Sequence, residues 1–144
     1  MNINGLNAKT TYGLQLRAGA DEQLLQFPQV KPGYEYSWPD ENGIETDPSE
    51  TPVFERLTYS LPIVIEGTGK TDFFTKYNAF RTFVLTAGEF NLDIPHLARR
   101  YKVRYSKMSS FNKLNMFTEG GRIYCLFTLE LTDDYPANYF TIPA

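Results

Sequence analysis

The feature that most constrains the fold is a long alternating segment, residues 57–65, which leads through a glycine-containing turn into a helical pattern. Apolar and mostly polar residues alternate along it, which is the period-two pattern of a strand with one buried face. Pro62 cannot donate a hydrogen bond to a neighbouring strand, so we expect this strand to lie at a sheet edge or to contain a bulge. Its apolar positions are Leu57, Tyr59, Leu61, Ile63 and Ile65.

The segment after the turn, residues 72–86, has the spacing of a helix. Its apolar residues recur three and four positions apart and form one stripe, which needs a sheet to cover. We expect Thr71 or Asp72 to cap the helix and Gly88 to end it. The stripe consists of Phe73, Tyr77, Phe80 and Val84.

Shorter alternating segments predict further strands. Within residues 11–27 we expect two short strands around a turn, the second at residues 22–27, and later strands over residues 89–94, 99–105 and 122–131. The 11 Phe and 10 Tyr residues also favour strands. We therefore predict a mainly β fold, a β-sandwich or a split barrel, with one flanking α-helix. The length of 144 residues fits a single domain over residues 1–144.

Residues 28–52 differ in composition from the rest of the chain. Their prolines and acidic residues predict a long loop, and a loop of this length in a compact domain usually has a function or lacks order. It does not have the spacing of a calcium loop, because Pro48 and Ser49 interrupt the pattern. Three aromatic residues at alternate positions indicate either a strand or a flat surface for a carbohydrate. They are Tyr34, Tyr36 and Trp38.

The turn at residues 67–71 reads Gly-Thr-Gly-Lys-Thr and has the residue types of a phosphate-binding loop. That loop also needs a glycine five positions before Gly69, where this chain has Val64. A shorter loop cannot wrap its amides around a pyrophosphate. We therefore interpret the segment as a turn between a strand and a helix, and we expect no nucleotide.

No set of residues in the sequence indicates catalysis, a cofactor or a metal. His96 has no second histidine or cysteine partner for a zinc site and is expected in a surface loop. Cys125 is the only cysteine and lies in an apolar run, where a buried, inert thiol is expected. A net charge of −3 argues against general nucleic-acid binding. The sequence predicts neither a secretory signal nor a membrane helix.

The densest positive region lies in the strand predicted at residues 99–105. Two interpretations stay open: a solvated strand face, or a surface that contacts the acidic loop of a neighbouring copy. No stacking aromatic residue shares the outward face, so nucleic-acid binding is not expected here. The candidate interface residues are Arg99, Arg100, Lys102 and Arg104 in the strand, and Trp38, Asp40 and Glu41 in the loop.

The ordered series of segments resembles the N-terminal domain of phage distal tail proteins, which are ring-forming adaptors between tail tube and baseplate. The resemblance covers roughly residues 10–136 and lies in the order of patterns rather than in an invariant motif. The segments that carry it are the loop "WPDENGIETD", the strand and turn "RLTYSLPIVIEGTGKTD", the helix and strand "FFTKYNAFRTFVLTAGEFNLDI", the charged strand "LARRYKVRYSKM" and the last strand "RIYCLFTLELTDDYP".

The resemblance implies a structural protein without catalysis, from a tailed phage or prophage. It implies a hexameric ring that contacts the tail tube, neighbouring subunits and other tail or baseplate proteins. It also implies assembly in the host cytoplasm and a place in the virion tail. A tail tube protein of related fold is an alternative, and a small carbohydrate-binding or ligand-binding β-sandwich is another. Many distal tail proteins continue into a second domain, whereas this sequence ends eight residues after Pro136.

Overall fold

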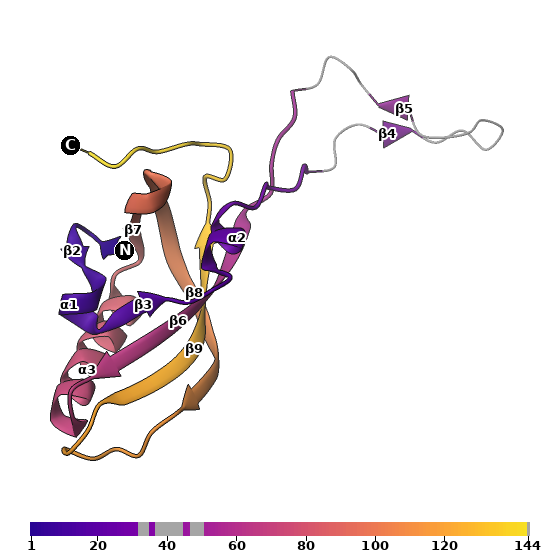
Figure 1. Ribbon diagram of the computed structural model, residues 1–144. Helices are drawn as coiled ribbons and strands as arrows, with labels where there is room; N and C mark the ends of the chain where they lie inside the picture. The colour runs from indigo at the N-terminus through magenta and orange to yellow at the C-terminus, as the bar shows by residue number, and fades with distance from the viewer. Residues whose placement is uncertain (32–34, 37–44, 47–50, 144) are drawn as a thin grey trace.

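The computed structural model describes residues 1–31, 35–36, 45–46 and 51–143, and at residues 35–36 and 45–46 it describes the backbone only. Seven strands form one antiparallel sheet in the order β2-β1-β7-β8-β9-β6-β3, and β4 pairs separately with β5 (Figure 1). The elements are β1 (Asn2–Ile3), β2 (Leu6–Asn7), α1 (Ala8–Tyr12), β3 (Leu14–Leu16), α2 (Ala20–Leu24), β4 (Glu35–Tyr36), β5 (Glu45–Thr46), β6 (Leu57–Gly67), α3 (Lys70–Thr86), β7 (Glu89–Ile94), the 3-10 turn η1 (Pro95–Leu97), β8 (Arg99–Lys113) and β9 (Ile123–Asp133).

The two outer strands of the main sheet, β2 and β3, are close in sequence although they lie at opposite ends of the strand order. Only α1 and Gly13 separate them. Asn7 caps α1 by accepting the N–H of Lys9 at 2.9 Å, and Gly13 ends it with a φ of 69°. Because a five-residue helix spans only about 7.5 Å, the sheet has to curl until its two edges approach each other.

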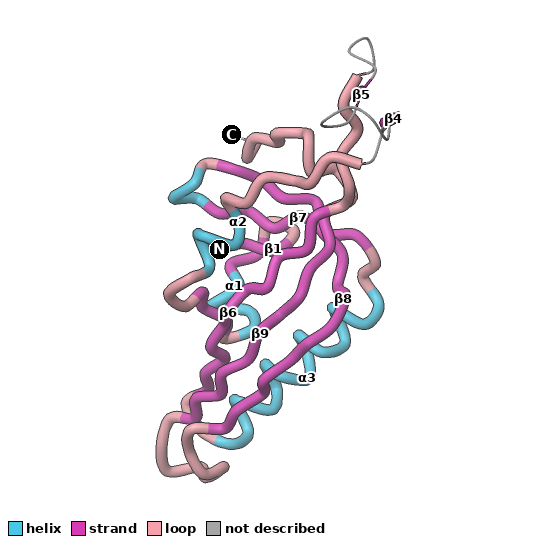
Figure 2. The backbone as a smooth tube through the Cα atoms, turned by 90° about the vertical axis from the view of Figure 1, so that its right-hand side faces the viewer, coloured by secondary structure: helices cyan, strands magenta, loops and turns pink. Residues whose placement is uncertain are grey.

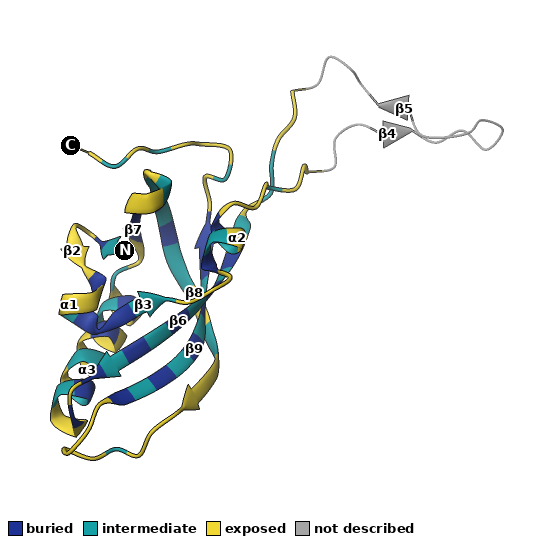
Figure 3. Ribbon diagram, viewed as in Figure 1, coloured by how far each residue is buried: buried dark blue, intermediate teal, exposed yellow. Residues whose placement is uncertain are grey.

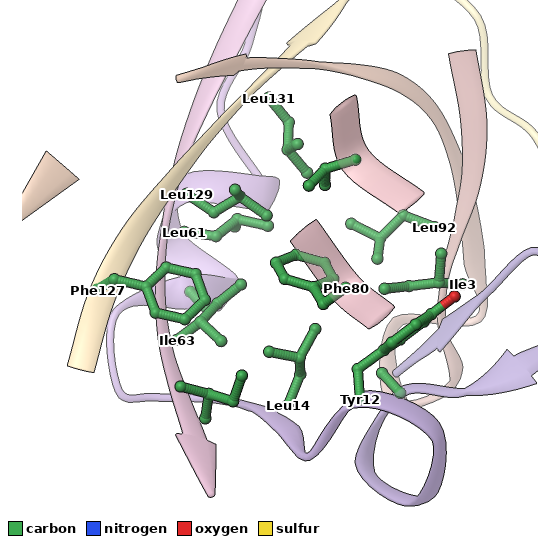
Figure 4. Packing of buried hydrophobic residues seen from close by; sticks show 14 of the residues in the cluster. Ile3, Tyr12, Leu14, Leu61, Ile63, Phe80, Leu92, Phe127, Leu129 and Leu131 are labelled. Carbon is green, nitrogen blue, oxygen red and sulfur yellow. The ribbon is translucent and has the colours of Figure 1, made fainter. Parts of the chain in front are cut away.

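The helix α3 packs against the face of the sheet that this curl encloses (Figure 2). Phe80 lies near the centre of the enclosed core, with its ring 5.6 Å from that of Tyr12 in α1 and 6.3 Å from that of Phe127 in β9 (Figure 4). Phe83 reaches Phe90 of β7 at 5.3 Å. One helix therefore contacts both sides of the curled sheet and closes it.

The core follows the alternation along the long strands (Figure 3). Strands β6 and β9 pair without a break from Leu57–Asp133 to Gly67–Ile123, so alternate residues of both strands point to the same side. The pairing of β8 with β9 shifts twice, between residues 105 and 107 and between residues 109 and 112. Such bulges bend a strand, which agrees with the curl of the sheet.

The predicted mainly β fold with a flanking helix is confirmed. The helix was expected at residues 72–86 and is found as α3, and the strands expected at residues 57–65, 89–94, 99–105 and 122–131 are found as β6, β7, β8 and β9. The seven main strands belong to one continuous sheet. The split barrel therefore describes the fold better than the sandwich, which needs two sheets.

The prediction for residues 22–27 was wrong. Within this stretch the chain forms the end of α2 instead of a strand. Ala20 and Leu24, four residues apart, are both buried, which one helical turn allows. A run of only six residues did not distinguish a helix from a strand, and tertiary packing decided it.

The expectation that Pro62 marks an edge or a bulge was also wrong. Strand β6 lies between β9 and β3, and its register with β9 is unbroken. The carbonyl oxygen of Pro62 accepts the N–H of Arg17 at 2.9 Å, so the backbone of Pro62 faces the side of β3. Because β3 ends at Leu16, the missing N–H of the proline falls just beyond the last regular pair of that ladder.

The helix α3 begins two or three residues earlier than expected. Its N-cap is Gly69, not Thr71 or Asp72. The Asp72 carboxylate instead accepts the backbone N–H of Thr68 at 2.9 Å, and this bond lowers the pKa of Asp72. The expected end at Gly88 is confirmed, since Gly88 follows the C-cap residue Ala87 with a φ of 65°.

Most of the predicted loop at residues 28–52 lies outside the described residues. A bridge between Val30 and Phe54 joins its two ends, and β4 pairs with β5 inside it. The interface candidates Trp38, Asp40 and Glu41 lie outside the described residues. The long acidic loop and the single domain over residues 1–144 therefore stay predictions.

We predict that Gly67→Ala destabilises the protein strongly. A Cβ atom at Gly67 would lie 2.5 Å from the Cα of Phe73, where β6 turns into α3. Moving the helix away from the sheet to relieve this overlap should cost about 2 kcal/mol of unfolding free energy. Urea denaturation followed by circular dichroism measures this loss.

The matched control is Gly120→Ala, because a Cβ at Gly120 meets no atom within 4 Å. This control should change the unfolding free energy by less than about 0.5 kcal/mol. Equal stabilities for the two variants would contradict the close approach of Gly67 to α3.

Candidate interaction surface

The basic strand is found where the sequence predicted it, and its two faces differ as expected. Tyr101 and Val103 in β8 are buried, while Arg100, Lys102 and Arg104 alternate with them on the other face. Because residues two apart in a strand share a face, Arg99 lies on the same face as the buried Tyr101. Its guanidinium carbon lies 4.5 Å from the centre of the Tyr101 ring.

Two of the basic side chains form ion pairs within the chain. Arg100 Nε lies 2.7 Å from Asp93 Oδ1 and Arg100 Nη2 lies 3.0 Å from Asp93 Oδ2, so the pair is bidentate. This contact with the buried Asp93 raises the pKa of Arg100. Arg104 Nε lies 2.8 Å from Asp134 Oδ2, and this bond lowers the pKa of Asp134. The positive charges of both arginines are therefore balanced locally.

The segment after β9, residues 134–140, lies across the same strand, and we call it the C-terminal strap. The backbone N–H of Arg100 donates to the carbonyl oxygen of Phe140 at 3.0 Å. Lys102 Nζ lies 4.6 Å from the centre of the Phe140 ring, and the guanidinium of Arg99 lies 5.0 Å from that of Tyr139. The basic strand therefore has an acidic and aromatic partner in its own chain.

A buried polar group fixes the point where the strap begins. Asp133, at the end of β9, is 3% exposed. Its Oδ2 accepts the hydroxyl of Tyr59 at 2.8 Å and its Oδ1 accepts the backbone N–H of Tyr135 at 2.8 Å. Burial and the hydrogen bond to Asp133 raise the pKa of Tyr59 well above its usual range. The Tyr59 hydroxyl therefore stays a donor throughout the physiological pH range.

Sequence reasoning missed the strap and the group that anchors it. The sequence patterns do not predict the strap, because residues 134–140 have neither alternation nor helical spacing. The residue types of the segment nevertheless indicate its partner. Two aspartates followed by aromatic residues, Tyr139 and Phe140, complement a strand that presents arginine and lysine.

The other residues considered in the sequence lie apart from this surface. His96 is exposed in η1, and its Nε2 lies 2.7 Å from Asp21 Oδ1. Cys125 is fully buried, as predicted, and burial raises the pKa of its thiol. Over the described ranges, no group of three or more metal-ligating side chains comes together.

The glycine-containing turn is a turn, as predicted. Glu119, from the loop between β8 and β9, accepts the backbone N–H of Thr71 at 2.9 Å and its hydroxyl at 2.8 Å. A carboxylate of the chain itself therefore lies at the start of α3, where a phosphate group would bind.

Six of the exposed apolar side chains of the described residues lie at the two ends of the long strands. At one end, around the Val30–Phe54 bridge that precedes β6, we define the first apolar surface as Phe27, Val30 and Val53. At the other end, where β8 leads into β9, we define the second apolar surface as Phe111, Leu114 and Met116. The most exposed of them are Phe27, at 91%, and Met116, at 77%.

Comparison with solved structures identifies the fold. The chain matches the crystal structure of the Dit (gp 19.1) protein of phage SPP1, described as a paradigm of the hub adsorption apparatus in phages that infect Gram-positive bacteria, with a TM-score of 0.65 at 12% sequence identity. The match covers 94% of this chain. The chain therefore has the fold of part of SPP1 Dit.

The likeness to SPP1 Dit lies in the fold, and this chain covers 49% of the length of that protein. No protein-family model matches the sequence, and no curated protein matches it. In the part of the chain that the structure describes, none of the helices is both long and apolar enough to cross a membrane.

We predict that Tyr59→Phe lowers the stability of the domain and loosens the start of the strap. The change leaves the buried Asp133 carboxylate without its hydroxyl donor, which should cost about 1–3 kcal/mol of unfolding free energy. Denaturant unfolding measures this loss, and hydrogen exchange at the Tyr135 amide measures the loosening.

The matched control is Tyr124→Phe in β9, because Tyr124 is only partly buried and its hydroxyl has no hydrogen bond to a described residue. The control should lose less than about 0.5 kcal/mol. If Tyr59→Phe is as stable as this control, the buried bond does not anchor the strap.

Proposed function

We propose that this protein is a structural component of a tailed phage or prophage that assembles into a ring at the distal end of the tail. The observation that carries the proposal is the match to SPP1 Dit over 94% of the chain. Because the match is spread over nearly all of the fold, the proposal concerns the domain and not a single motif.

The subunit surface supports assembly by head-to-tail contacts. Such contacts join two different surfaces of the same protein, and they close into a ring when the rotation between subunits allows it. The two apolar surfaces differ in composition and lie at opposite ends of β6, β8 and β9. Exposed apolar clusters are a frequent mark of protein interfaces. We propose six subunits in the ring.

The proposed partners are neighbouring subunits, the tail tube and other tail or baseplate proteins. Assembly would take place in the host cytoplasm and the finished ring would belong to the virion tail. The proposed role is structural and not enzymatic. The proposed contact residues are Arg99, Arg100, Lys102 and Arg104 in β8, and Trp38, Asp40 and Glu41 in the predicted loop.

We predict that the purified chain forms closed rings. Native mass spectrometry should show a discrete oligomer of six subunits, and negative-stain electron microscopy should show single rings with a central opening. Stacked tubes would favour a tail tube protein instead. A strict monomer at all concentrations in both measurements would count against a ring-forming tail protein.

We further predict that Phe27→Ser and Met116→Ser weaken the ring while the subunit stays folded. Each change removes an exposed apolar side chain from one end of the subunit, so the loss of buried apolar area should fall on the interface. We expect the oligomer to dissociate at about tenfold higher protein concentration than the wild type.

The matched control is Leu85→Ser, which removes an apolar side chain of 56% exposure from α3, outside both apolar surfaces. Dissociation of this control at the same concentration as the two variants would show that the two surfaces have no special part in assembly. Circular dichroism of all three variants checks that the subunit itself is intact.

A further inference from the structure

The first apolar surface contains one phenylalanine that is almost fully exposed. Phe27 is 91% exposed and lies between α2 and the Val30–Phe54 bridge. Pro28 follows it, and a proline restricts the backbone of the preceding residue to extended conformations. The Phe27 ring therefore extends into solvent from a short segment with a restricted backbone. A large apolar side chain in this position is stabilised most when another molecule covers it.

The second apolar surface has a base of packed aromatic rings. The ring of Phe111 is stacked on that of Phe127 in β9 at 6.0 Å and meets the ring of Tyr77 in α3 edge-on at 6.2 Å. Phe111 is still 45% exposed, so part of its ring is left for a partner. Leu114 and Met116 lie in the loop that follows, at 54% and 77% exposure. Another aromatic ring can pack on such a base, and the unbranched methionine can adapt its conformation around it.

The segments around the two apolar surfaces carry opposite charge. Residues 20–55, which lead into and out of the first apolar surface, contain nine acidic residues and one basic residue. Residues 105–122, which run from β8 to the start of β9, contain three basic residues and one acidic residue. That acidic residue is Glu119, whose carboxylate accepts the N–H and the hydroxyl of Thr71. The first apolar surface therefore has acidic surroundings, and the second has basic surroundings.

The cations around the second apolar surface are accessible to a partner. Lys107 Nζ lies 3.3 Å from Glu130 Oε2, but the lysine side chain is 67% exposed. Arg122 Nη1 lies 3.6 Å from Glu66 Oε2, and the arginine side chain is 63% exposed. Lys113 is exposed as well. Because ion pairs at such exposed positions contribute little to stability, these side chains can turn towards acidic groups of another molecule.

We infer that the first apolar surface of each subunit binds the second apolar surface of the next, with Phe27 against Phe111 and Met116 of its neighbour. This inference rests on the ring proposed above. The two surfaces are different, both are apolar, and their surroundings are opposite in charge, as a head-to-tail contact between copies requires. A second copy fits better than an unrelated partner, because one chain supplies both halves of the contact.

Cysteine cross-linking tests which surfaces meet. One chain has Gln26→Cys, beside Phe27, and a second, isotopically labelled chain has Thr118→Cys, so every apolar side chain of the two surfaces is kept. A short bis-maleimide then joins thiols that lie close together. Cys125 is fully buried and should not react. The matched control replaces Thr118→Cys by Thr82→Cys, because Thr82 is an exposed threonine in α3, outside both apolar surfaces.

We expect the equal mixture of Gln26→Cys and Thr118→Cys chains to give cross-linked dimers with one chain of each kind. Their yield should be about tenfold that of the control mixture, because the contact holds the two thiols at a high effective concentration. A single chain with both substitutions should give a series of cross-linked species up to the complete ring. Native mass spectrometry shows beforehand that rings are present, and denaturing mass spectrometry counts labelled and unlabelled chains.

Three results would overturn the inference, and they differ. Cross-links only between chains of the same kind would show that each apolar surface meets its own copy. Rings with no more mixed cross-links than the control would show that the two surfaces face other molecules, and only the contact would be wrong. If the wild type forms no ring, the proposed function fails and the contact fails with it.

Discussion

The curl of the main sheet depends on the short link through α1. Strands β2 and β3 form the two edges of the sheet, yet a five-residue helix and one glycine join them. This link brings the edges together, and the enclosed face becomes a cavity that α3 has to fill. Phe80 fills its centre between Tyr12 and Phe127. The tight turn at Gly67, the bulges of β8 and the position of the helix all follow from the need to close this core.

The same closure determines which surfaces are left for partners. Because α3 and the N-terminal segment cover the inner face of the sheet, contacts with other molecules are left to the outer face, the strand edges and the two ends. The ends carry the two apolar surfaces, and the strap lies against β8. A protein whose core is closed by its own helix and whose ends differ suits repeated head-to-tail assembly. The proposed ring uses these surfaces and needs no change in the core.

Sequence patterns predicted the parts of the fold that depend on burial along a regular element. The alternation in β6 and β9 and the stripe of α3 each extend over many residues, so local sequence and tertiary packing agree there. The predictions were wrong where the segment was short, or where the structure depends on contacts between residues far apart in the sequence. The six residues 22–27 did not distinguish the end of α2 from a strand. Pro62 predicted an edge or a bulge, because the sequence does not show that β3 ends at Leu16. The partner of the basic strand was missed for the same reason, since Asp134 lies 30 residues from Arg104.

A fold shared at 12% identity has a consequence for where function lies. Cores tolerate many apolar replacements as long as pattern and volume are kept, so two chains can share the curl, the helix and the strand order with few identical residues. Surface contacts tolerate fewer residue replacements than the core, because an interface residue must match its partner in charge and shape. Any partner specificity of this protein should therefore depend on its own surface residues rather than on positions shared with SPP1 Dit. The common fold alone would therefore not make the proposed ring of this chain accept subunits of another protein.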